Sequence, residues 1–168
     1  MEVPLFYVKG KQAFRKELGS MRLLGNAAQL VRSLSDEYAL FHMVDLDALK
    51  GNRTNFDLYD HFTYFTHVQV ECKPDQKMVR DLLAMEARVV VDLPSGLDFE
   101  KFGKKKTLIV GKVKPGYAEP FPPIREILLD GKDDELARRI LSEDKRLFVK
   151  KEFYPKGFRR AFGVLFEL

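Results

Sequence analysis

Four charged residues end or follow short apolar runs, and their types suit the binding of a metal ion or a phosphorylated ligand. They are Asp45, Glu71, Asp92 and Lys112, and Asp47 follows closely after the first of them. If the apolar runs are parallel strands of a barrel, their carboxyl ends meet at the face where barrel enzymes place their active sites. Carboxylates that converge there bind Mg²⁺, with a phosphorylated ligand supplying further oxygens. Asp45, Glu71, Asp92 and Lys112 are therefore candidate catalytic residues, and Asp45, Asp47 and Glu71 are candidate metal ligands.

The same acids have a structural interpretation, in which each strand-end carboxylate caps the next helix or turn. We favour this role for Asp45, because it ends the run LFHMVDL, which is typical of a buried parallel strand. On this interpretation the sequence predicts neither a bound metal nor a cofactor.

Other reactive side chains lack the partners that chemistry would need. His42, His61 and His67 have no Cys or His at zinc-binding spacing, so we expect packed or surface histidines. Cys72 has no evident His–acid partner and is expected to be an ordinary thiol. Glycine-rich nucleotide-binding motifs are missing from the sequence.

The elements that must position these residues alternate between short apolar runs and helical periodicity, the pattern of successive βα units. Strands are predicted at residues 4–8, 40–46, 67–70, 88–93 and 107–110. Helices are predicted at residues 26–35, with Asn26 as the N-cap, and at 55–65 and 74–85.

The remaining residues, 116–168, form a divergent and basic C-terminal part. A proline-rich connector at 115–123 precedes a strand at 124–129, a helix at 133–142 and two strands at 147–153 and 161–168. Residues 150–163 interleave lysines and arginines with Phe153, Tyr154 and Phe158, an arrangement that suits nucleic-acid binding. We favour a hairpin that turns at 155–157, with its aromatic rings packed on the sheet and its cations in water.

The segment FHMVDLDALKGNRTN, residues 41–55, resembles the second strand and following loop of the phosphoribosyl isomerase and cyclase-synthase barrels of histidine biosynthesis. The matching residues, in the order of that family, are His42, Val44, Asp45, Leu46, Asp47, Ala48, Gly51 and Asn55. Residues 4–11 look like the family's first strand and turn. The resemblance spans residues 3–115 and implies a TIM-barrel-like α/β fold with its site at the carboxyl ends of the strands.

The chain departs from this family where catalysis would occur. The family has carboxylates at the ends of its first and fifth strands, whereas this chain has Tyr7 at the first position and Gly111 or Lys112 at the second. The glycine-rich phosphate loop is replaced by ECKPD, residues 71–75, and the second phosphate turn by DLPSG, residues 92–96. Histidine-pathway isomerase activity is therefore not expected.

The length of 168 residues also departs from an ordinary eight-stranded barrel, which needs about 200–250 residues. Five βα units fit into residues 1–115. We therefore predict a single domain, residues 1–168, with a shortened or incomplete barrel whose open edge is covered by the C-terminal part or by a second copy of the chain.

Composition narrows the functional classes further. A single cysteine, no apolar run long enough for a membrane span and no secretion-signal pattern favour a cytoplasmic protein without a membrane partner. The favoured function is a non-catalytic, self-associating scaffold or ligand-binding protein, with a phosphorylated small molecule as the ligand. The alternatives are a lyase or isomerase acting on a phosphorylated sugar through the strand-end carboxylates, and nucleic-acid binding through the basic C-terminal part.

Overall fold

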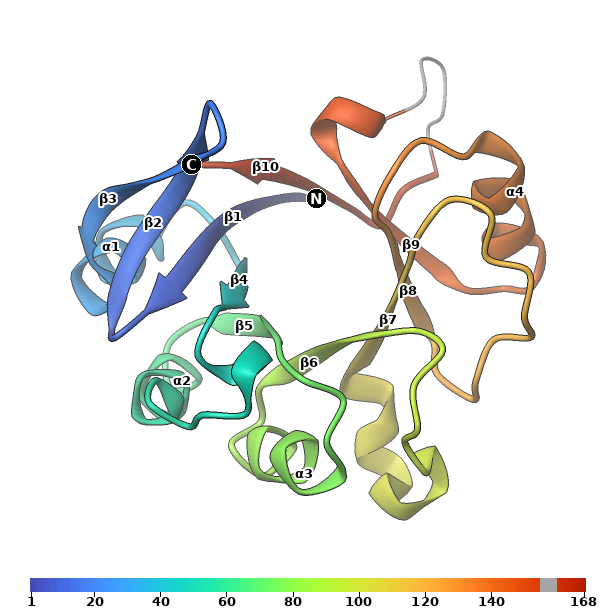
Figure 1. The fold of residues 1–168 in the computed structure, drawn as a ribbon, viewed down its shortest axis with the longest axis horizontal. Helices are drawn as coiled ribbons and strands as arrows, with labels where there is room; N and C mark the ends of the chain where they lie inside the picture. Colours follow the sequence, from blue (N-terminus) through green and yellow to red (C-terminus); the bar gives the residue numbers. More distant parts are fainter. Residues whose placement is uncertain (155–159) are drawn as a thin grey trace.

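The computed structural model describes residues 1–154 and 160–168. Within these residues, eight parallel strands close into a barrel with helices around it (Figure 1). The order around the ring is β1, β4, β5, β6, β7, β8, β9 and β10, and β10 pairs in parallel with β1 to close it. The predicted α/β, TIM-barrel-like fold is confirmed.

The barrel strands are β1 (Glu2–Lys9), β4 (Leu40–Asp45), β5 (His67–Glu71), β6 (Arg88–Asp92), β7 (Ile109–Val113), β8 (Glu126–Leu129), β9 (Arg146–Lys150) and β10 (Gly163–Glu167). The α-helices are α1 (Ala27–Leu34), α2 (Phe56–Phe62), α3 (Gln76–Ala84) and α4 (Asp134–Ser142). The 3₁₀ helices of the described residues are η1 (Ala48–Lys50), η2 (Phe99–Leu108) and η3 (Lys151–Phe153). In the two described ranges, no helix is both long and apolar enough to cross a membrane.

The barrel is complete, which corrects the prediction of an incomplete sheet and confirms the alternative in which the C-terminal part covers the edge. The C-terminal part supplies β8, β9 and β10, so three of the eight barrel strands come from residues 116–168. Eight strands fit this short chain because its α-helices span only seven to nine residues and the connection from β7 to β8 contains no helix. A closed eight-stranded barrel can therefore form from fewer residues than an ordinary barrel contains.

The last two strands pair in parallel, which corrects the predicted hairpin near the C-terminus. Gly163 lies beside Phe148 and Leu165 beside Lys150 in this pairing. The turn predicted at 155–157 lies outside the described residues.

A β-hairpin extends the sheet beyond the barrel and was not predicted. It consists of β2 (Gln12–Glu17) and β3 (Ser20–Asn26), and β2 pairs antiparallel with β1 (Figure 1). The hairpin stands beside the carboxyl end of β1 and leads into α1, so it forms part of the rim of the barrel.

Capping side chains fix where three of the helices begin. Asn26 accepts hydrogen bonds from the backbone N–H groups of Ala28 and Gln29, which confirms the predicted N-cap. Asp75 and Asp133 cap α3 and α4 in the same way. Such caps satisfy N–H groups that have no partner within the helix.

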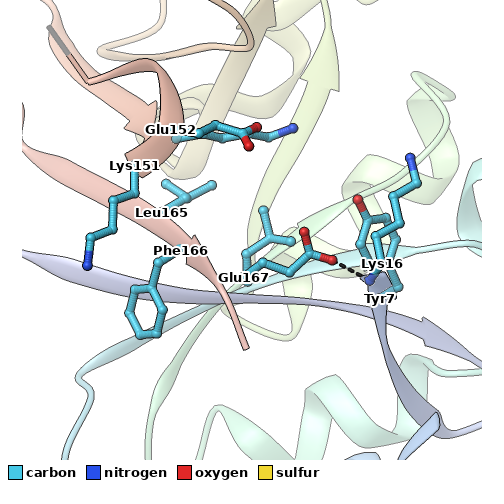
Figure 2. A pocket seen from close by; sticks show the side chains of 9 residues that line it. Tyr7, Lys16, Lys151, Glu152, Leu165, Phe166 and Glu167 are labelled. Atoms are coloured by element: carbon cyan, nitrogen blue, oxygen red, sulfur yellow. Dashed lines mark hydrogen bonds between the residues drawn. The ribbon is translucent and has the colours of Figure 1, made fainter. Parts of the chain in front are cut away.

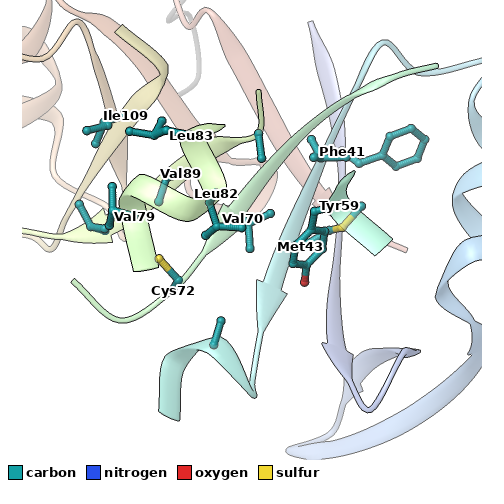
Figure 3. Close-up of a cluster of buried hydrophobic side chains, with 14 of the residues drawn as sticks. Phe41, Met43, Tyr59, Val70, Cys72, Val79, Leu82, Leu83, Val89 and Ile109 are labelled. Carbon is teal, nitrogen blue, oxygen red and sulfur yellow. The ribbon is translucent and has the colours of Figure 1, made fainter. Parts of the chain in front are cut away.

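Alternation along the strands divides the apolar residues between two cores. Outward-facing residues such as Phe41, Met43 and Val70 pack against Tyr59 of α2 and Leu82 of α3 (Figure 3). The inward-facing cluster fills the middle of the barrel and contains Val3, Leu5, Leu40, Val90, Val110, Leu128, Phe148 and Leu165. This cluster leaves the two ends of the interior to polar side chains.

Candidate functional site

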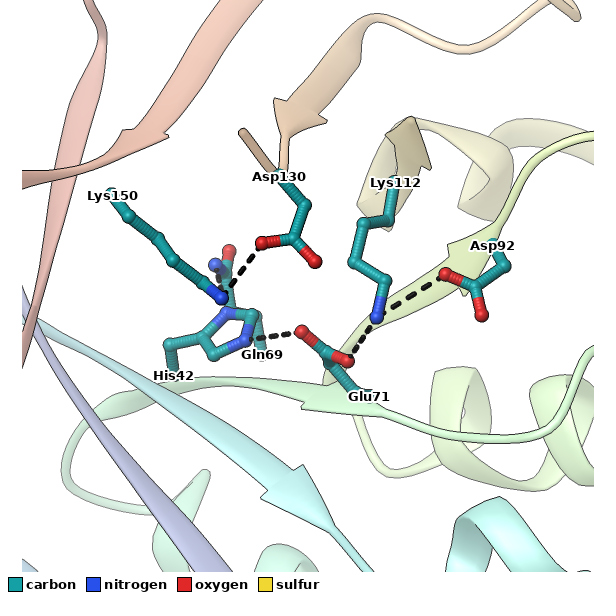
Figure 4. Close-up of polar contacts among 7 residues, drawn as sticks. All are labelled: His42, Gln69, Glu71, Asp92, Lys112, Asp130 and Lys150. Atoms are coloured by element: carbon teal, nitrogen blue, oxygen red, sulfur yellow. Dashed lines mark hydrogen bonds and ion pairs between the residues drawn. The ribbon is translucent and has the colours of Figure 1, made fainter. Parts of the chain in front are cut away.

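Three of the predicted site residues meet at the carboxyl end of the barrel. Glu71, Asp92 and Lys112 come from β5, β6 and β7, which are adjacent parallel strands, and their side chains point toward one another (Figure 4). Lys112 Nζ lies 2.6 Å from Glu71 Oε2 and 3.2 Å from Asp92 Oδ1. The lysine therefore joins two carboxylates from neighbouring strands.

The buried side of this cluster continues to a histidine and an amide. His42 Nε2 lies 2.9 Å from Glu71 Oε1, and His42 Nδ1 lies 2.7 Å from Gln69 Nε2. His42 and Gln69 are fully buried. His42, for which a packed or a surface position was expected, is therefore packed in the core behind Glu71.

Hydrogen bonding and charge hold Glu71 and Lys112 in their ionised forms. Burial by itself would raise the pKa of Glu71, but hydrogen bonds and electrostatic interactions with His42 and Lys112 outweigh it and lower the pKa to about 2. Burial would likewise lower the pKa of Lys112, but the carboxylates of Glu71 and Asp92 outweigh it and raise that pKa. Both groups are fixed charges at neutral pH.

A second ion pair lies next to this cluster and was not predicted. Lys150, at the end of β9, places its Nζ 2.7 Å from Oδ1 of Asp130, which directly follows β8 (Figure 4). The rule that singled out Asp45 and Asp92 also applies to Asp130, because Asp130 follows the strand predicted at 124–129. The signal was present in the sequence, but the barrel was expected to end before that strand.

Tyr7 occupies the mouth of the barrel as a neutral hydroxyl. Burial and the negative charges of Glu167, Glu71 and Asp130 raise its pKa to about 12, against a smaller opposing effect of Lys112. A tyrosine in this state donates a hydrogen bond at neutral pH and does not act as a base.

A cavity of about 640 Å³ opens beside Tyr7 (Figure 2). Its walls are Leu5, Tyr7, Lys16, Lys150, Lys151, Glu152, Leu165, Phe166 and Glu167. Lys16 reaches in from the β2–β3 hairpin, where its backbone N–H donates to Glu167 and its ammonium lies 5.7 Å from the centroid of the Tyr7 ring. The cavity thus combines apolar walls, a phenol and side chains of both charges, and its size is that of a small-molecule site.

Asp45 does not belong to this cluster, because its side chain points away from the barrel interior. The pairing places Val44, not Asp45, beside Glu71, and a shift of one residue along a strand moves a side chain to the other face. Asp45 accepts hydrogen bonds from the backbone of Asp47 and Ala48, and from Asn55 and Tyr59. These four contacts are those of a residue that organises the loop after β4.

Asp47 belongs to the same loop as Asp45. Its Oδ2 accepts hydrogen bonds from the backbone N–H of Gly10 and from Asn55. The proposed grouping of Asp45, Asp47 and Glu71 around a metal ion is therefore wrong. In the part of the chain that the structure describes, His, Cys, Asp and Glu residues form no group of three or more that could hold a metal ion.

Cys72 and Tyr154 are packed against the core. Burial, with the nearby charges of Asp45, Asp75 and Glu71, raises the pKa of the Cys72 thiol to about 12, as for an unreactive thiol. Tyr154 packs against the outer core, so its ring is not a free stacking surface. Phe158 lies outside the described residues.

A further charged cluster lies at the opposite end of the barrel and was also not predicted. Arg88, Glu126 and Arg146 are the first residues of β6, β8 and β9, and both arginines form ion pairs with Glu126. Burial and the charge of Arg146 lower the pKa of Arg88 to about 10. Because loops at this end of a barrel serve stability rather than chemistry, this cluster is a structural element.

Comparison with protein-family models and with curated proteins gives no match for this chain.

Proposed function

We propose that this protein binds a small phosphorylated molecule, of the sugar-phosphate class, in the cavity at the carboxyl end of the barrel, and that it does so without catalysing a reaction. The observation that carries the proposal is the set of fixed charges and donors around Tyr7. Lysines suit a phosphate group, carboxylates suit sugar hydroxyls, and Tyr7 offers a flat apolar surface.

The absence of catalysis is proposed from the protonation states of the inward-facing groups. General acid–base catalysis works best when the catalytic pKa lies near the working pH. The pKa of Glu71 is about 2 and that of Tyr7 about 12, and the pKa of Lys112 is raised. Such groups bind and orient a ligand, but they exchange protons poorly at neutral pH.

The resemblance to phosphoribosyl isomerases supports the same proposal. Tyr7 stands at the first position where that family has a carboxylate, and Gly111 or Lys112 stands at the second. Tyr7 and Lys112 both lie at the carboxyl end of this barrel. A barrel that retained a ligand site and replaced its acid–base pair would show this combination. We therefore propose a degenerate relative of that family.

Isothermal titration calorimetry with ribose 5-phosphate as the probe tests the binding proposal. We expect binding to the wild-type protein, with ribose at least about tenfold weaker, and an affinity about tenfold lower in Lys150→Met. Lys104→Met is the control, because Lys104 is an exposed residue of η2 outside the cavity. Equal affinities for ribose and ribose 5-phosphate would contradict the proposal.

The non-catalytic part of the proposal has its own readout. Ribose 5-phosphate incubated with the protein in D₂O is expected to keep its proton and phosphorus NMR spectra unchanged. Deuterium incorporation or a new product would instead support the lyase or isomerase alternative.

Self-association is a second candidate property, and we propose that it occurs through β3. This strand ends the sheet, and within the described residues β2 is its only strand partner. Met21 and Leu23 are exposed on it, and a second copy would supply an equivalent strand for antiparallel pairing. Sedimentation should show a dimer that the double variant Met21→Lys/Leu23→Lys converts to a monomer, whereas a wild-type monomer would contradict this candidate.

A further inference from the structure

The two carboxylates that hold Lys112 differ in their environment. The side chain of Glu71 is 6% exposed and that of Asp92 is 57% exposed, whereas the side chain of Lys112 is 14% exposed. The longer contact is the one to Asp92, at 3.2 Å compared with 2.6 Å to Glu71. Glu71 thus fixes the ammonium from the buried side, and Asp92 covers it from the solvent side.

An exposed ion pair contributes little net stability, because water and salt screen it. The contact between Asp92 and Lys112 can therefore be exchanged for another anion at low cost. The contact between Glu71 and Lys112 cannot be exchanged in this way, because a buried carboxylate without its partner would carry a large desolvation penalty. Lys112 consequently has one permanent partner and one replaceable partner.

A cavity of about 370 Å³ lies on the side of Lys112 that faces Asp92. Asp92, Lys112, Lys114, Gly116 and Tyr117 are among its walls, and Lys114, the first residue after β7, adds a second lysine. This cavity is separate from the larger one, since the two share no wall residue. It offers an anion two lysines and a single competing carboxylate.

We propose that the cavity between Lys112 and Lys114 is a second anion subsite that binds a phosphate group, and that Asp92 occupies this subsite as an internal competitor when phosphate is absent. This subsite goes beyond the proposed function, whose ligand lies in the larger cavity lined by Tyr7 and Lys150. A phosphate dianion carries more charge than a carboxylate and has three acceptor oxygens, so it replaces Asp92 at Lys112 and also reaches Lys114. Glu71 acts as a positioning residue that keeps the ammonium in place.

The competitor role predicts an effect that ordinary loss of a ligand-binding residue would not produce. Asp92→Asn removes the competing charge and its repulsion of the incoming anion, so we expect inorganic phosphate to bind about tenfold more tightly than to the wild type. Lys112→Met should abolish the binding. Asp98→Asn is the matched control, because Asp98 is also an exposed acid paired with a lysine, Lys101, but does not line the cavity.

Calorimetric titration with inorganic phosphate at pH 8, where phosphate is mainly a dianion, measures all four proteins. If Lys112→Met does not fold, as judged by circular dichroism, Lys114→Met replaces it, because Lys114 is exposed and should lose only part of the affinity. The inference would be overturned if Asp92→Asn bound inorganic phosphate no more tightly than the wild type does. It would also be overturned if the lysine variant bound phosphate with wild-type affinity.

The two proposals fail in distinguishable ways. Ribose 5-phosphate that binds the wild type and depends on Lys150, with no gain in Asp92→Asn, would leave the proposed function standing and remove the subsite. Inorganic phosphate that binds more tightly to Asp92→Asn, with ribose 5-phosphate binding no better than inorganic phosphate, would keep the subsite and remove the sugar-phosphate assignment.

Discussion

At the scale of single residues, Asp45 is a buried carboxylate that organises the loop after β4. It is fully buried and accepts four hydrogen bonds, the shortest from the Tyr59 hydroxyl at 2.7 Å. We predict that Asp45→Ala lowers the free energy of unfolding by about 3 kcal/mol, because buried donors lose their acceptor. Urea unfolding measures this, and millimolar Mg²⁺ should change neither the wild type nor the variant.

Asp57→Ala is the control for that measurement. Asp57 is exposed and pairs with Lys11 on the surface, so its removal should change stability by less than about 1 kcal/mol. Equal losses in the two variants would mean that the loop after β4 does not depend on Asp45.

The lowered pKa of Glu71 predicts how the stability of the protein changes with pH. Its pKa is lowered from 4.5 to about 2 in the folded protein, so the folded state binds this proton less readily than the unfolded state. The resulting stability is complete above about pH 4.5 and is lost as the pH falls toward 2. Glu71→Gln should lower stability at neutral pH and flatten its decline between these values.

Urea midpoints measured from pH 7 to pH 2.5 test this prediction. Glu100→Gln serves as the control, because Glu100 forms its ion pair with Lys106 at the surface. This variant should leave the change of the urea midpoint with pH as it is in the wild type. If the urea midpoint of Glu71→Gln changed with pH as steeply as that of the wild type, Glu71 would not be the group that causes the loss of stability in acid.

At the scale of elements, the sequence predicts a strand where apolar residues are continuous and a helix where they recur at helical spacing. Residues 40–46 have the first pattern and residues 74–85 have the second, and β4 and α3 form there. The β2–β3 hairpin has no such pattern, because β3 is exposed along most of its length and its sequence SMRLLGN mixes polar and apolar side chains. Its formation depends on pairing with β1, which local sequence does not reveal.

The candidate site could be predicted in part for the same reason. Strand ends are visible in sequence, so Glu71, Asp92 and Lys112 were identified. Whether a strand-end side chain faces inward depends on the register between strands, and this excluded Asp45. The pair formed by Asp130 and Lys150 requires the barrel to be closed by the last three strands, which the length of the chain argued against.

Closure of the barrel depends on a glycine at the start of β10. A Cβ on Gly163 would lie 2.5 Å from Cδ1 of Phe148, whose ring is fully buried inside the barrel. We predict that Gly163→Ala lowers the free energy of unfolding by about 2 kcal/mol, because the ring has no room to move. Gly96→Ala should have little effect, since a Cβ there meets no atom within 4 Å. Thermal and urea unfolding compare the two, and equal stabilities would contradict the tight closure.

At the scale of the whole molecule, the barrel interior has two polar ends and an apolar middle. The end formed by the first residues of the strands holds Arg88, Glu126 and Arg146, whereas the carboxyl end holds the cluster around Lys112. The apolar layer between them includes Val90, Val110 and Leu128. Such a layer separates the two ends, so each can be altered with little effect on the other.

This separation predicts opposite outcomes for substitutions at the two ends. Glu126→Gln leaves two arginines without their counter-charge and should cost about 3 kcal/mol of stability, because Glu126 is buried. At a temperature where the variant stays folded, it should bind ribose 5-phosphate with wild-type affinity.

Lys150→Met should show the converse, with weaker binding and stability within about 1 kcal/mol of the wild type, since Lys150 and Asp130 are both partly exposed. The double variant Arg88→Met/Glu126→Met should recover part of the stability lost in Glu126→Gln, because apolar groups replace the buried pair and the remaining cation, Arg146, is partly exposed to water. Urea unfolding and calorimetry on the same samples give both quantities. Weaker ligand binding in Glu126→Gln, comparable with that in Lys150→Met, would show that the apolar layer does not isolate the ends and that the mouth of the barrel is coupled to its base.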